Sequence, residues 1–389
     1  MVSQPDIPIT GLGKMDTILH EIFNKETWLV SKPSLVLLNV ISRNRSLAIG
    51  MNTEKKKKIR LGFTDFWPEF DKSDNYFTRL LAGTYDVEIT EDPDYLIFSN
   101  WGWNHTRFKC VRIFYTGEPL HPNTCNCDYS FTFDFIQSAT HYRLPLYGML
   151  AEAPALRGSK DTCPEDLIKP KDYASGVARQ KTKFCAFVVS NPNGNKRNEF
   201  FDKLSKYKKV DSCGRYKNNI GGPVIDKMQA LPHYKFTIAF ENSEYPGYTS
   251  EKIVEPMLAG SLPIYWGNPL IHRDFDPASF INYYDFGSDE SLIERIIELD
   301  RDDGKYQDVL QTPWYHNNQV NDYVNKVNVL AQFRHIFSTN LKRPSAMTWK
   351  AHFAEEIRPA IGRYVTFKKI KRLWESFVAN ERRSNKRTS

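Results

Sequence analysis

The sequence predicts an α/β fold made of two Rossmann-like domains. Short apolar runs of strand length alternate along the chain with stretches of helical periodicity, which is the pattern of a parallel sheet. Polar and aromatic residues gather directly after several of these runs, where open parallel sheets bind ligands. At 389 residues the chain is long enough for two domains. The expected organisation is an N-terminal extension over 1–54, a first Rossmann-like domain over 55–165, a second over 166–345 and a C-terminal tail over 346–389.

The composition is that of a globular protein, with 41% hydrophobic, 14% aromatic and 25% charged residues. The six cysteines are too few and too scattered for a disulfide framework, which favours a reducing compartment. No stretch approaches the roughly 18 apolar residues of a membrane span. The N-terminus also lacks the basic and apolar regions of a secretory signal.

Three strands are expected in the first domain, at 59–63, 94–98 and 111–115, because each is a short apolar run bounded by polar residues. The extension before them carries a candidate helix at 15–23 and an apolar run at 35–41, but no motif. The loops after the three strands hold side chains suited to ligand binding: Trp67, Trp101, Trp103 and Glu118.

The segment 151–183 is rich in Lys, Pro and Ala with little periodicity, and it is interpreted as a linker. A second alternating series follows it. The expected elements are a strand at 184–190, a loop at 191–195, a helix at 196–207, a strand at 209–211 and further helices at 290–299 and 319–338.

Residues 236–268 are expected to form a strand, a loop, a helix and a second strand. The apolar runs at 236–240 and 262–266 are the strands. Between them, apolar residues at helical spacing follow Glu251, with Ser250 placed as the N-cap and Gly260 as the terminator. Pro256 falls in the second turn and is expected to kink or shorten the helix.

The start of this helix carries Glu251 and Lys252, which suits one half of a nucleotide site. Free backbone N–H groups and the helix dipole attract an anion there, worth about 0.3–1 kcal/mol at an exposed end. Lys252 adds a full positive charge, so a diphosphate fits. Glu251 is suited to accept hydrogen bonds from sugar hydroxyls. The alternative is that both residues are ordinary solvent-facing side chains of a first helical turn.

The segment FENSEYPGYTSEKIVEPMLAGSLPIYWG resembles the signature of the α-1,3/4-fucosyltransferases, glycosyltransferase family 10. The similarity extends in matching order from about Lys58 to Phe286. It implies a GT-B fold, in which two Rossmann-like domains face each other across a cleft. It also implies that GDP-fucose is the donor substrate. The matched residues then take donor-binding roles: Asn242, Tyr248, Glu251 and Lys252.

Arg197 lies at the start of the helix expected after the loop 191–195. A guanidinium there can bind a diphosphate bidentately and, with Lys252, neutralise a departing GDP. The stretch around it matches the family at Val189, Ser190, Asn191 and Arg197, so Ser190 and Asn191 join the donor-binding candidates. The alternative is an ordinary surface arginine.

Glu118 is the candidate general base. A carboxylate with an ordinary pKa of about 4.3 is ionised at neutral pH and can take a proton from a sugar hydroxyl. The segment RIFYTGEP resembles the family motif Tyr-Thr-Gly-Glu, whose Glu is the proposed base. Judged by the carboxylate alone, a surface acid is the simpler interpretation.

Four further residues are candidates for binding the acceptor glycan: Trp67, Trp101, Trp103 and His121. Exposed aromatic rings beside Glu118 can stack on sugar faces. The alternative is that they pack into the core between the domains.

A metal site is not expected. The Asp-X-Asp pairs at 92–94 and 274–276 both read as turns, and the cysteines at 125 and 127 lack a second ligand pair at zinc spacing. Cations at two helix starts can take over the charge neutralisation that a divalent metal would provide.

The net charge of +7 is concentrated near the C-terminus, where residues 368–387 hold eight Lys or Arg against two Glu. Apolar residues at helical spacing over 370–378 make this a basic amphipathic helix. Such a helix suits peripheral contact with an anionic membrane. The alternative is a helix packed on the protein. Nucleic acid is not an expected partner, because no recognised binding motif accompanies the charge.

The expected function is inverting transfer of L-fucose from GDP-β-L-fucose to a hydroxyl of GlcNAc or glucose, forming an α-1,3 or α-1,4 linkage. The acceptor is an N-acetyllactosamine-type or lactose-type glycan, bound by the first domain. Animal and plant family members carry an N-terminal span, and its absence here favours a bacterial cytoplasmic enzyme, peripheral on the inner membrane, or a shortened chain. The alternatives are a GT-B enzyme using another nucleotide sugar and a non-catalytic glycan-binding protein at a membrane surface.

Overall fold

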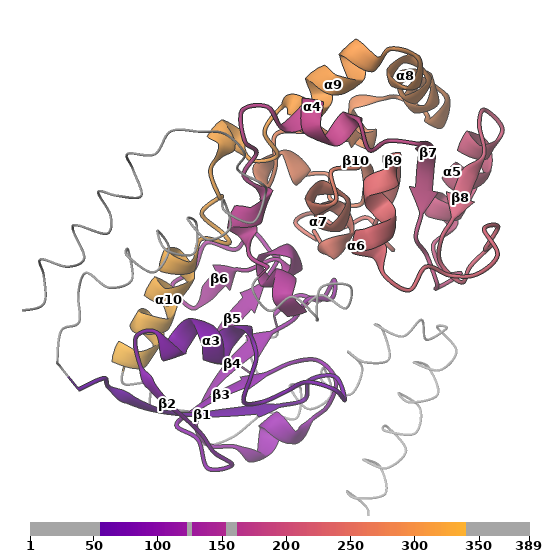
Figure 1. Cartoon of the computed structure of the whole chain (residues 1–389). Helices are drawn as coiled ribbons and strands as arrows, with labels where there is room; N and C mark the ends of the chain where they lie inside the picture. The colour runs from indigo at the N-terminus through magenta and orange to yellow at the C-terminus, as the bar shows by residue number, and fades with distance from the viewer. Residues whose placement is uncertain (1–54, 123–126, 153–161, 340–389) are drawn as a thin grey trace, which may run out of the picture. The chain divides into compact units, whose positions relative to one another are not determined.

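The computed structural model describes residues 55–122, 127–152 and 162–339 (Figure 1). The first sheet has six parallel strands in the order β2-β1-β3-β4-β5-β6. Their bounds are β1 Lys58–Thr64, β2 Asp86–Ile89, β3 Tyr95–Phe98, β4 Val111–Tyr115, β5 Tyr129–Thr132 and β6 His141–Arg143. The three predicted strands are confirmed as β1, β3 and β4. The other three are not apolar runs, because polar residues interrupt them.

Two α-helices pack on the core of the first sheet, α3 (Tyr76–Ala82) and α10 (Lys326–Ser338), and they lie beside each other in Figure 1. The start of α3 is fixed by Asn75, whose side chain accepts hydrogen bonds from the N–H groups of Phe77 and Thr78. Phe333 of α10 stacks on Phe131 of β5 at 4.8 Å. The last described helix therefore completes the hydrophobic core of the first sheet.

Short 3-10 helices connect the remaining parts of this region: η1 Asn104–Arg107 and η2 Leu146–Glu152.

The second sheet has five parallel strands in the order β11-β10-β9-β7-β8. Its strands are β7 Lys183–Phe187, β8 Val210–Ser212, β9 Tyr234–Phe240, β10 Leu262–Trp266 and β11 Ile281–Asn282. Its helices are α4 Tyr173–Ala178, α5 Asn195–Ser205, α6 Lys227–Ala230, α7 Glu251–Leu258, α8 Asp289–Arg301 and α9 Asp303–Gln311. Short 3-10 helices lie at η3 Pro164–Leu167, η4 Leu231–His233, η5 Ile271–Arg273, η6 Pro277–Ser279, η7 Tyr283–Asp285 and η8 His316–Asn318. Two parallel sheets confirm the predicted α/β class.

The central unit β9-α7-β10 follows its prediction closely. Ser250 caps α7 by accepting a hydrogen bond from the Lys252 N–H at 3.3 Å. Gly260 has φ +67°, which a residue with a side chain rarely adopts, and the helix ends just before it. Pro256 lies inside a helix of eight residues, so the helix is short but starts where the sequence predicts.

Two predictions about helices and linkers are wrong. The segment 151–183 is not a plain linker, because its described part includes η3 and α4, and the Ala174 N–H of α4 donates to Gln311 at the end of α9. The helix expected at 319–338 begins only at Lys326. Asn325 caps it there by accepting from the Val327 N–H, and the preceding residues form turns.

A buried ion pair connects the two sheets. Arg143 of β6 donates to both carboxylate oxygens of Asp274, at 2.6 and 2.9 Å, just beyond η5. The guanidinium lies between the rings of Phe135 and Tyr323, 4.2 and 4.4 Å from their centroids. It also donates to the Gly247 carbonyl in the loop before α7. The first sheet thus contacts the loop that leads into the central helix.

The expected helices at 15–23 and 370–378, and the apolar run at 35–41, lie outside the described residues. Within the described part of the chain, no helix has both the length and the apolar composition to cross a bilayer.

Candidate active site

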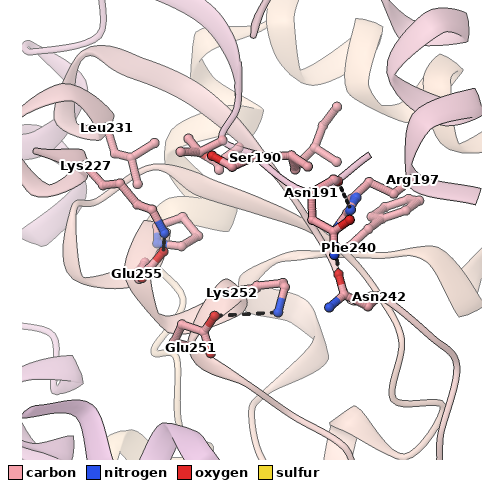
Figure 2. A pocket seen from close by; sticks show the side chains of 15 residues that line it. Ser190, Asn191, Arg197, Lys227, Leu231, Phe240, Asn242, Glu251, Lys252 and Glu255 are labelled. Atoms are coloured by element: carbon pink, nitrogen blue, oxygen red, sulfur yellow. Dashed lines mark hydrogen bonds and ion pairs between the residues drawn. The ribbon is translucent and has the colours of Figure 1, made fainter. Parts of the chain in front are cut away.

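A pocket of about 200 Å³ lies at the carboxyl ends of β7 and β9, beside the first turns of α5 and α7 (Figure 2). This is the edge at which a parallel sheet binds ligands. The residues predicted to bind the donor line it, with the exception of Tyr248: Ser190, Asn191, Arg197, Asn242, Glu251 and Lys252. Residues separated by sixty positions in sequence are therefore brought to one cavity.

Lys252 is held at the start of α7 by two carboxylates. Its Nζ lies 3.1 Å from Glu241 and 3.6 Å from Glu251, and it donates to the Ser250 hydroxyl at 3.0 Å. Burial alone would lower the pKa of Lys252, but the two carboxylates raise it well above its ordinary value. The lysine is therefore charged at neutral pH, as a phosphate-binding residue requires.

Glu241 is a site residue that the sequence prediction missed. It is fully buried at the end of β9 and accepts from both the Ser250 N–H and the Ser250 hydroxyl, each at 2.8 Å. Burial raises its pKa, and Lys252 opposes that shift. For Glu251, burial also acts to raise the pKa, but Lys252 outweighs it and the pKa is lowered. Glu241 thus fixes both the helix cap and the lysine.

Arg197 is 2% exposed and organises the loop at the other side of the pocket. Its guanidinium donates to Asn242 Oδ1 at 2.6 Å and to the carbonyls of Asn191 and Asn193 at 2.9 and 2.7 Å. A Cβ added to Gly194, which has φ +138°, would come within 3.0 Å of the same guanidinium. The alternative of an ordinary surface arginine is therefore wrong, since the charge is buried among loop carbonyls and faces the pocket.

Glu118 lies in the loop after β4. Its N–H donates to the hydroxyl of buried Thr116 at 3.0 Å, and that hydroxyl donates to Asn100. The residue is exposed, yet its carboxyl group is partly desolvated by the surrounding protein, and this raises its pKa. Lys252 opposes the shift, and the negative charges of Glu251 and Glu241 add to it. Glu118 of the first sheet is therefore within electrostatic reach of the charged residues at the start of α7.

Tyr248 does not line the donor pocket. It is buried, and its ring packs against Phe133 at 5.4 Å. Burial raises the pKa of its hydroxyl, with opposition from Lys252 and support from Glu241 and Glu118. The residue thus packs on the end of the first sheet, two residues before the Ser250 cap of α7.

Among the aromatic candidates, Trp101 is 49% and Trp103 36% exposed. The alternative that these two rings pack into a core is therefore wrong. Trp67 is partly buried and packs edge-on against Phe66 and Phe70, so its ring belongs to a local cluster.

Asp65 holds the loop that carries Trp101 and Trp103, a role that no local sequence pattern indicates. It has φ +59°, a conformation that Asp and Asn tolerate better than most residues. Its carboxylate accepts from the backbone N–H groups of Asn104 and His105 and pairs with His105 Nδ1 at 2.6 Å. The two exposed rings are therefore presented by a fixed loop.

His121 is exposed but not free. Its Nδ1 lies 2.8 Å from Asp134 and its Nε2 is hydrogen-bonded to the Tyr245 hydroxyl, which also donates to Asp134 at 3.2 Å. Tyr245 belongs to the loop before α7. His121 thus connects the loop that carries Glu118 with the loop before α7.

Neither Asp-X-Asp pair is arranged as an open metal site. Asp274 is buried, and its carboxylate accepts from Arg143, from Tyr147 and from the Thr249 hydroxyl. Asp92 lies at the surface and pairs with Arg60. Over residues 55–122, 127–152 and 162–339, no group of three potential metal ligands occurs.

Two domain families match the chain. The "Alpha-(1,3)-fucosyltransferase FucT N-terminal domain" matches residues 61–150, and "Glycosyltransferase family 10 (fucosyltransferase) C-term" matches residues 178–339. Together the two matches cover more than half of the chain, the first over strands of the first sheet and the second over the strands of the second sheet.

The chain belongs to glycosyltransferase family 10.

Individual family 10 proteins are similar to this chain over only part of their own length. The alpha-(1,3)-fucosyltransferase FucT of Helicobacter pylori is 30% identical over 293 residues, which is 67% of this chain and 61% of the relative. The human 4-galactosyl-N-acetylglucosaminide 3-alpha-L-fucosyltransferase FUT6 is 35% identical over 130 residues, 32% of this chain and 36% of the relative. The chain thus spans about three fifths of the first relative and about a third of the second.

A crystal structure of an alpha1,3-fucosyltransferase with GDP-fucose is similar to this family 10 chain, with a TM-score of 0.61 and 26% identity. The similarity covers 76% of this chain and 96% of that one. This similarity and the two parallel sheets confirm the predicted GT-B fold with two Rossmann-like domains.

Proposed function

We propose that this chain is an inverting, GDP-fucose-dependent α-1,3-fucosyltransferase. The observation that carries the proposal is the convergence of Lys252 and Arg197, from the starts of two helices, on one pocket whose charges are coupled to Glu118 of the other sheet. The similarity to the Helicobacter pylori enzyme and to the GDP-fucose complex supports the choice of donor.

Donor binding uses the polar residues of the pocket. Lys252, kept charged by Glu241, and Arg197, kept in place by Asn242, lie where a diphosphate is stabilised. As the bond between the fucose C1 and the phosphate oxygen breaks, negative charge develops on GDP and these cations stabilise it. Glu251 accepts hydrogen bonds from sugar hydroxyls, and Ser190 and Asn191 line the loop side. Tyr248, buried behind them, positions the loop. These groups act without any metal-dependent step.

Glu118 is the general base of the proposed reaction. The acceptor hydroxyl transfers its proton to the Glu118 carboxylate while its oxygen forms a bond to the fucose C1. GDP leaves from the opposite face, so the β-linked donor gives an α-linked product. A pKa raised above the ordinary value brings the base closer to a neutral operating pH, which favours proton transfer.

The acceptor is proposed to bind on the first sheet. Trp101 and Trp103 offer exposed rings on a fixed loop, and Trp67 and His121 lie on neighbouring loops. Stacking on such rings suits the apolar face of a sugar. The proposed acceptor is a GlcNAc or glucose unit in an N-acetyllactosamine-type or lactose-type glycan, linked α-1,3 or α-1,4. The name of the human relative, which specifies a galactosyl-N-acetylglucosaminide, supports this class.

The cellular location is part of the proposal. We propose a reducing cytoplasmic environment with peripheral contact to an anionic inner membrane through the basic segment 346–389. Four of the described cysteines support the first point, because Cys110, Cys163, Cys185 and Cys213 are free thiols.

A donor and acceptor screen tests the proposed activity. GDP-fucose is offered with N-acetyllactosamine, lactose and a type 1 chain, while GDP release and the product linkage are measured. UDP-galactose and GDP-mannose serve as control donors. The proposal expects α-fucosylated product and stoichiometric GDP only with GDP-fucose. Binding of the glycans without nucleotide release, or equal turnover of a control donor, would contradict it.

A further inference from the structure

One end of the donor pocket is formed by α6, η4 and α7 and has no role in the mechanism above. Lys227, Leu231 and Glu255 lie there, on the side opposite Arg197 and Asn242, with Glu251 and Lys252 between the two ends (Figure 2). Glu255 is only 4% exposed. Its Oε2 accepts a hydrogen bond from Lys227 Nζ at 2.8 Å.

The second carboxylate oxygen of Glu255 is buried and has no hydrogen-bond partner among the residues that the structure describes. A buried acceptor left without a donor is unfavourable, and native proteins rarely contain one. Burial raises the pKa of the Glu255 carboxyl group, and the Lys227 ammonium opposes that shift. In the ion pair with Lys227 the carboxyl group is ionised, so Oε1 is an acceptor. Since Glu255 lines the pocket, a bound ligand can supply the missing donor.

The helix geometry indicates which part of a nucleotide reaches this oxygen. Glu255 follows Glu251 by four residues, so the two side chains share one face of α7 about 6 Å apart along its axis. With the diphosphate at Lys252 and Arg197 and a sugar at Glu251, the next group along the helix is the base. Leu231 and Pro256 give this end of the pocket the apolar walls that suit a planar ring.

The three common bases present different groups to a carboxylate. Guanine offers two adjacent donors, its N1–H and its 2-amino group. Adenine offers one donor, its 6-amino group, beside an acceptor at N1, and uracil offers one N–H between two carbonyl oxygens. In both bases the acceptor next to the donor repels a carboxylate. We infer that Glu255, held by Lys227, accepts hydrogen bonds from the guanine edge and selects GDP-linked sugars over those linked to UDP or ADP. The inference rests on the proposed function and names its specificity residue.

Nucleotide binding to the unmodified full-length protein is the first test, by titration calorimetry with GDP, IDP, ADP and UDP. IDP keeps the N1–H of guanine and lacks the 2-amino group. The expected order is GDP, then IDP about 3- to 10-fold weaker, then ADP and UDP at least about 100-fold weaker. Binding of ADP or UDP within threefold of GDP would overturn the inference without any variant.

The second test is Glu255→Gln. Lys227 attracts the amide oxygen of the new side chain, which turns the NH₂ group toward the base and sets donor against donor. GDP affinity is expected to fall about 30-fold, while ADP and UDP change less than threefold. Glu294→Gln, an exposed acid on α8, is the matched control and should leave all four affinities unchanged. Unchanged GDP affinity in Glu255→Gln, or an equal loss for all four nucleotides, would contradict base recognition.

The outcomes separate this inference from the proposed function. If the unmodified protein transfers fucose and binds GDP but Glu255→Gln keeps the same preference, only the inference fails. If the unmodified protein neither binds GDP nor releases it from GDP-fucose, the proposed function fails and the inference with it. A thermal melt of each variant reports whether it is folded. If Glu255→Gln is not folded, the nucleotide titrations of the unmodified protein decide whether the inference holds.

Discussion

Lys252 and Glu241 form an ion pair of 3.1 Å in which the carboxylate is fully buried and the lysine faces the pocket. The pair joins the end of β9 to the start of α7, so the same contact fixes the helix cap and holds a positive charge at the pocket. A buried carboxylate whose partner is removed is strongly unfavourable. Binding and stability are therefore coupled at this position.

Removing Lys252 should reduce both properties. Lys252→Ala is expected to weaken GDP binding by about 10- to 100-fold, because a charge-assisted contact to the diphosphate is lost. It should also lower the free energy of unfolding by about 2–3 kcal/mol, since Glu241 stays buried without its cation. Calorimetry and urea unfolding measure the two effects. Lys206→Ala, at an exposed position after α5, should change neither; if Lys252→Ala matches it, the assigned role of Lys252 is wrong.

The ion pair between Arg143 and Asp274 predicts a second stability effect. Asp274→Ala leaves the buried guanidinium of Arg143 without its bidentate partner, and the free energy of unfolding should fall by about 3–5 kcal/mol. Asp92→Ala, at the exposed Asp-X-Asp pair, should lower the free energy of unfolding by less than about 0.5 kcal/mol. Urea unfolding of the two variants checks this. Equal stabilities would show that the contact between the sheets contributes little.

The raised pKa of Glu118 predicts the acid limb of the pH profile. Catalysis needs the ionised base, so kcat/KM should fall as the pH drops through a pKa that lies above the ordinary value for a glutamate. Glu251→Gln removes a nearby negative charge and should move the limb to lower pH. Lys252→Ala removes a positive charge and should move it to higher pH. Profiles of fucose transfer between pH 4 and 8 test these directions, and a limb that moves the same way in both variants would count against Glu118.

The exposed tryptophans predict an effect on the acceptor alone. Trp101→Ala or Trp103→Ala should raise the acceptor KM about 2- to 10-fold, the size of a lost aromatic contact, and leave GDP affinity unchanged. Ile225→Ala, which shortens a fully exposed apolar side chain, is the control. Initial rates at varied acceptor concentration give the KM. An unchanged acceptor KM in both Trp variants would show that the acceptor does not bind at these two tryptophans.

Local patterns were enough to predict the central unit. The apolar runs of β9 and β10 are bounded by polar residues, and Ser250 and Gly260 mark the ends of α7, so the sequence alone placed Glu251 and Lys252 at a helix start. The short strands β2, β5 and β6 were missed because polar residues interrupt them, so they do not stand out as apolar runs.

Other features depend on contacts between distant residues, which no local pattern encodes. The packing of α10 on the first sheet joins Phe333 to Phe131, two hundred residues apart. The roles of Glu241 and Asp65 arise only when Lys252 and His105 are brought against them. For Glu241, an acid placed directly after a buried strand is a signal that sequence analysis can use, because a buried carboxylate needs a partner.

The comparison of Glu118→Gln with the unmodified protein tests the central claim most directly. The variant keeps the size of the side chain and removes the base. We predict that kcat for fucose transfer falls by about 100-fold to 10,000-fold, the range assigned to general base catalysis, while the Kd for GDP changes less than twofold. A variant that transfers fucose at the unmodified rate would contradict the assignment of Glu118 and with it the proposed arrangement of the active site.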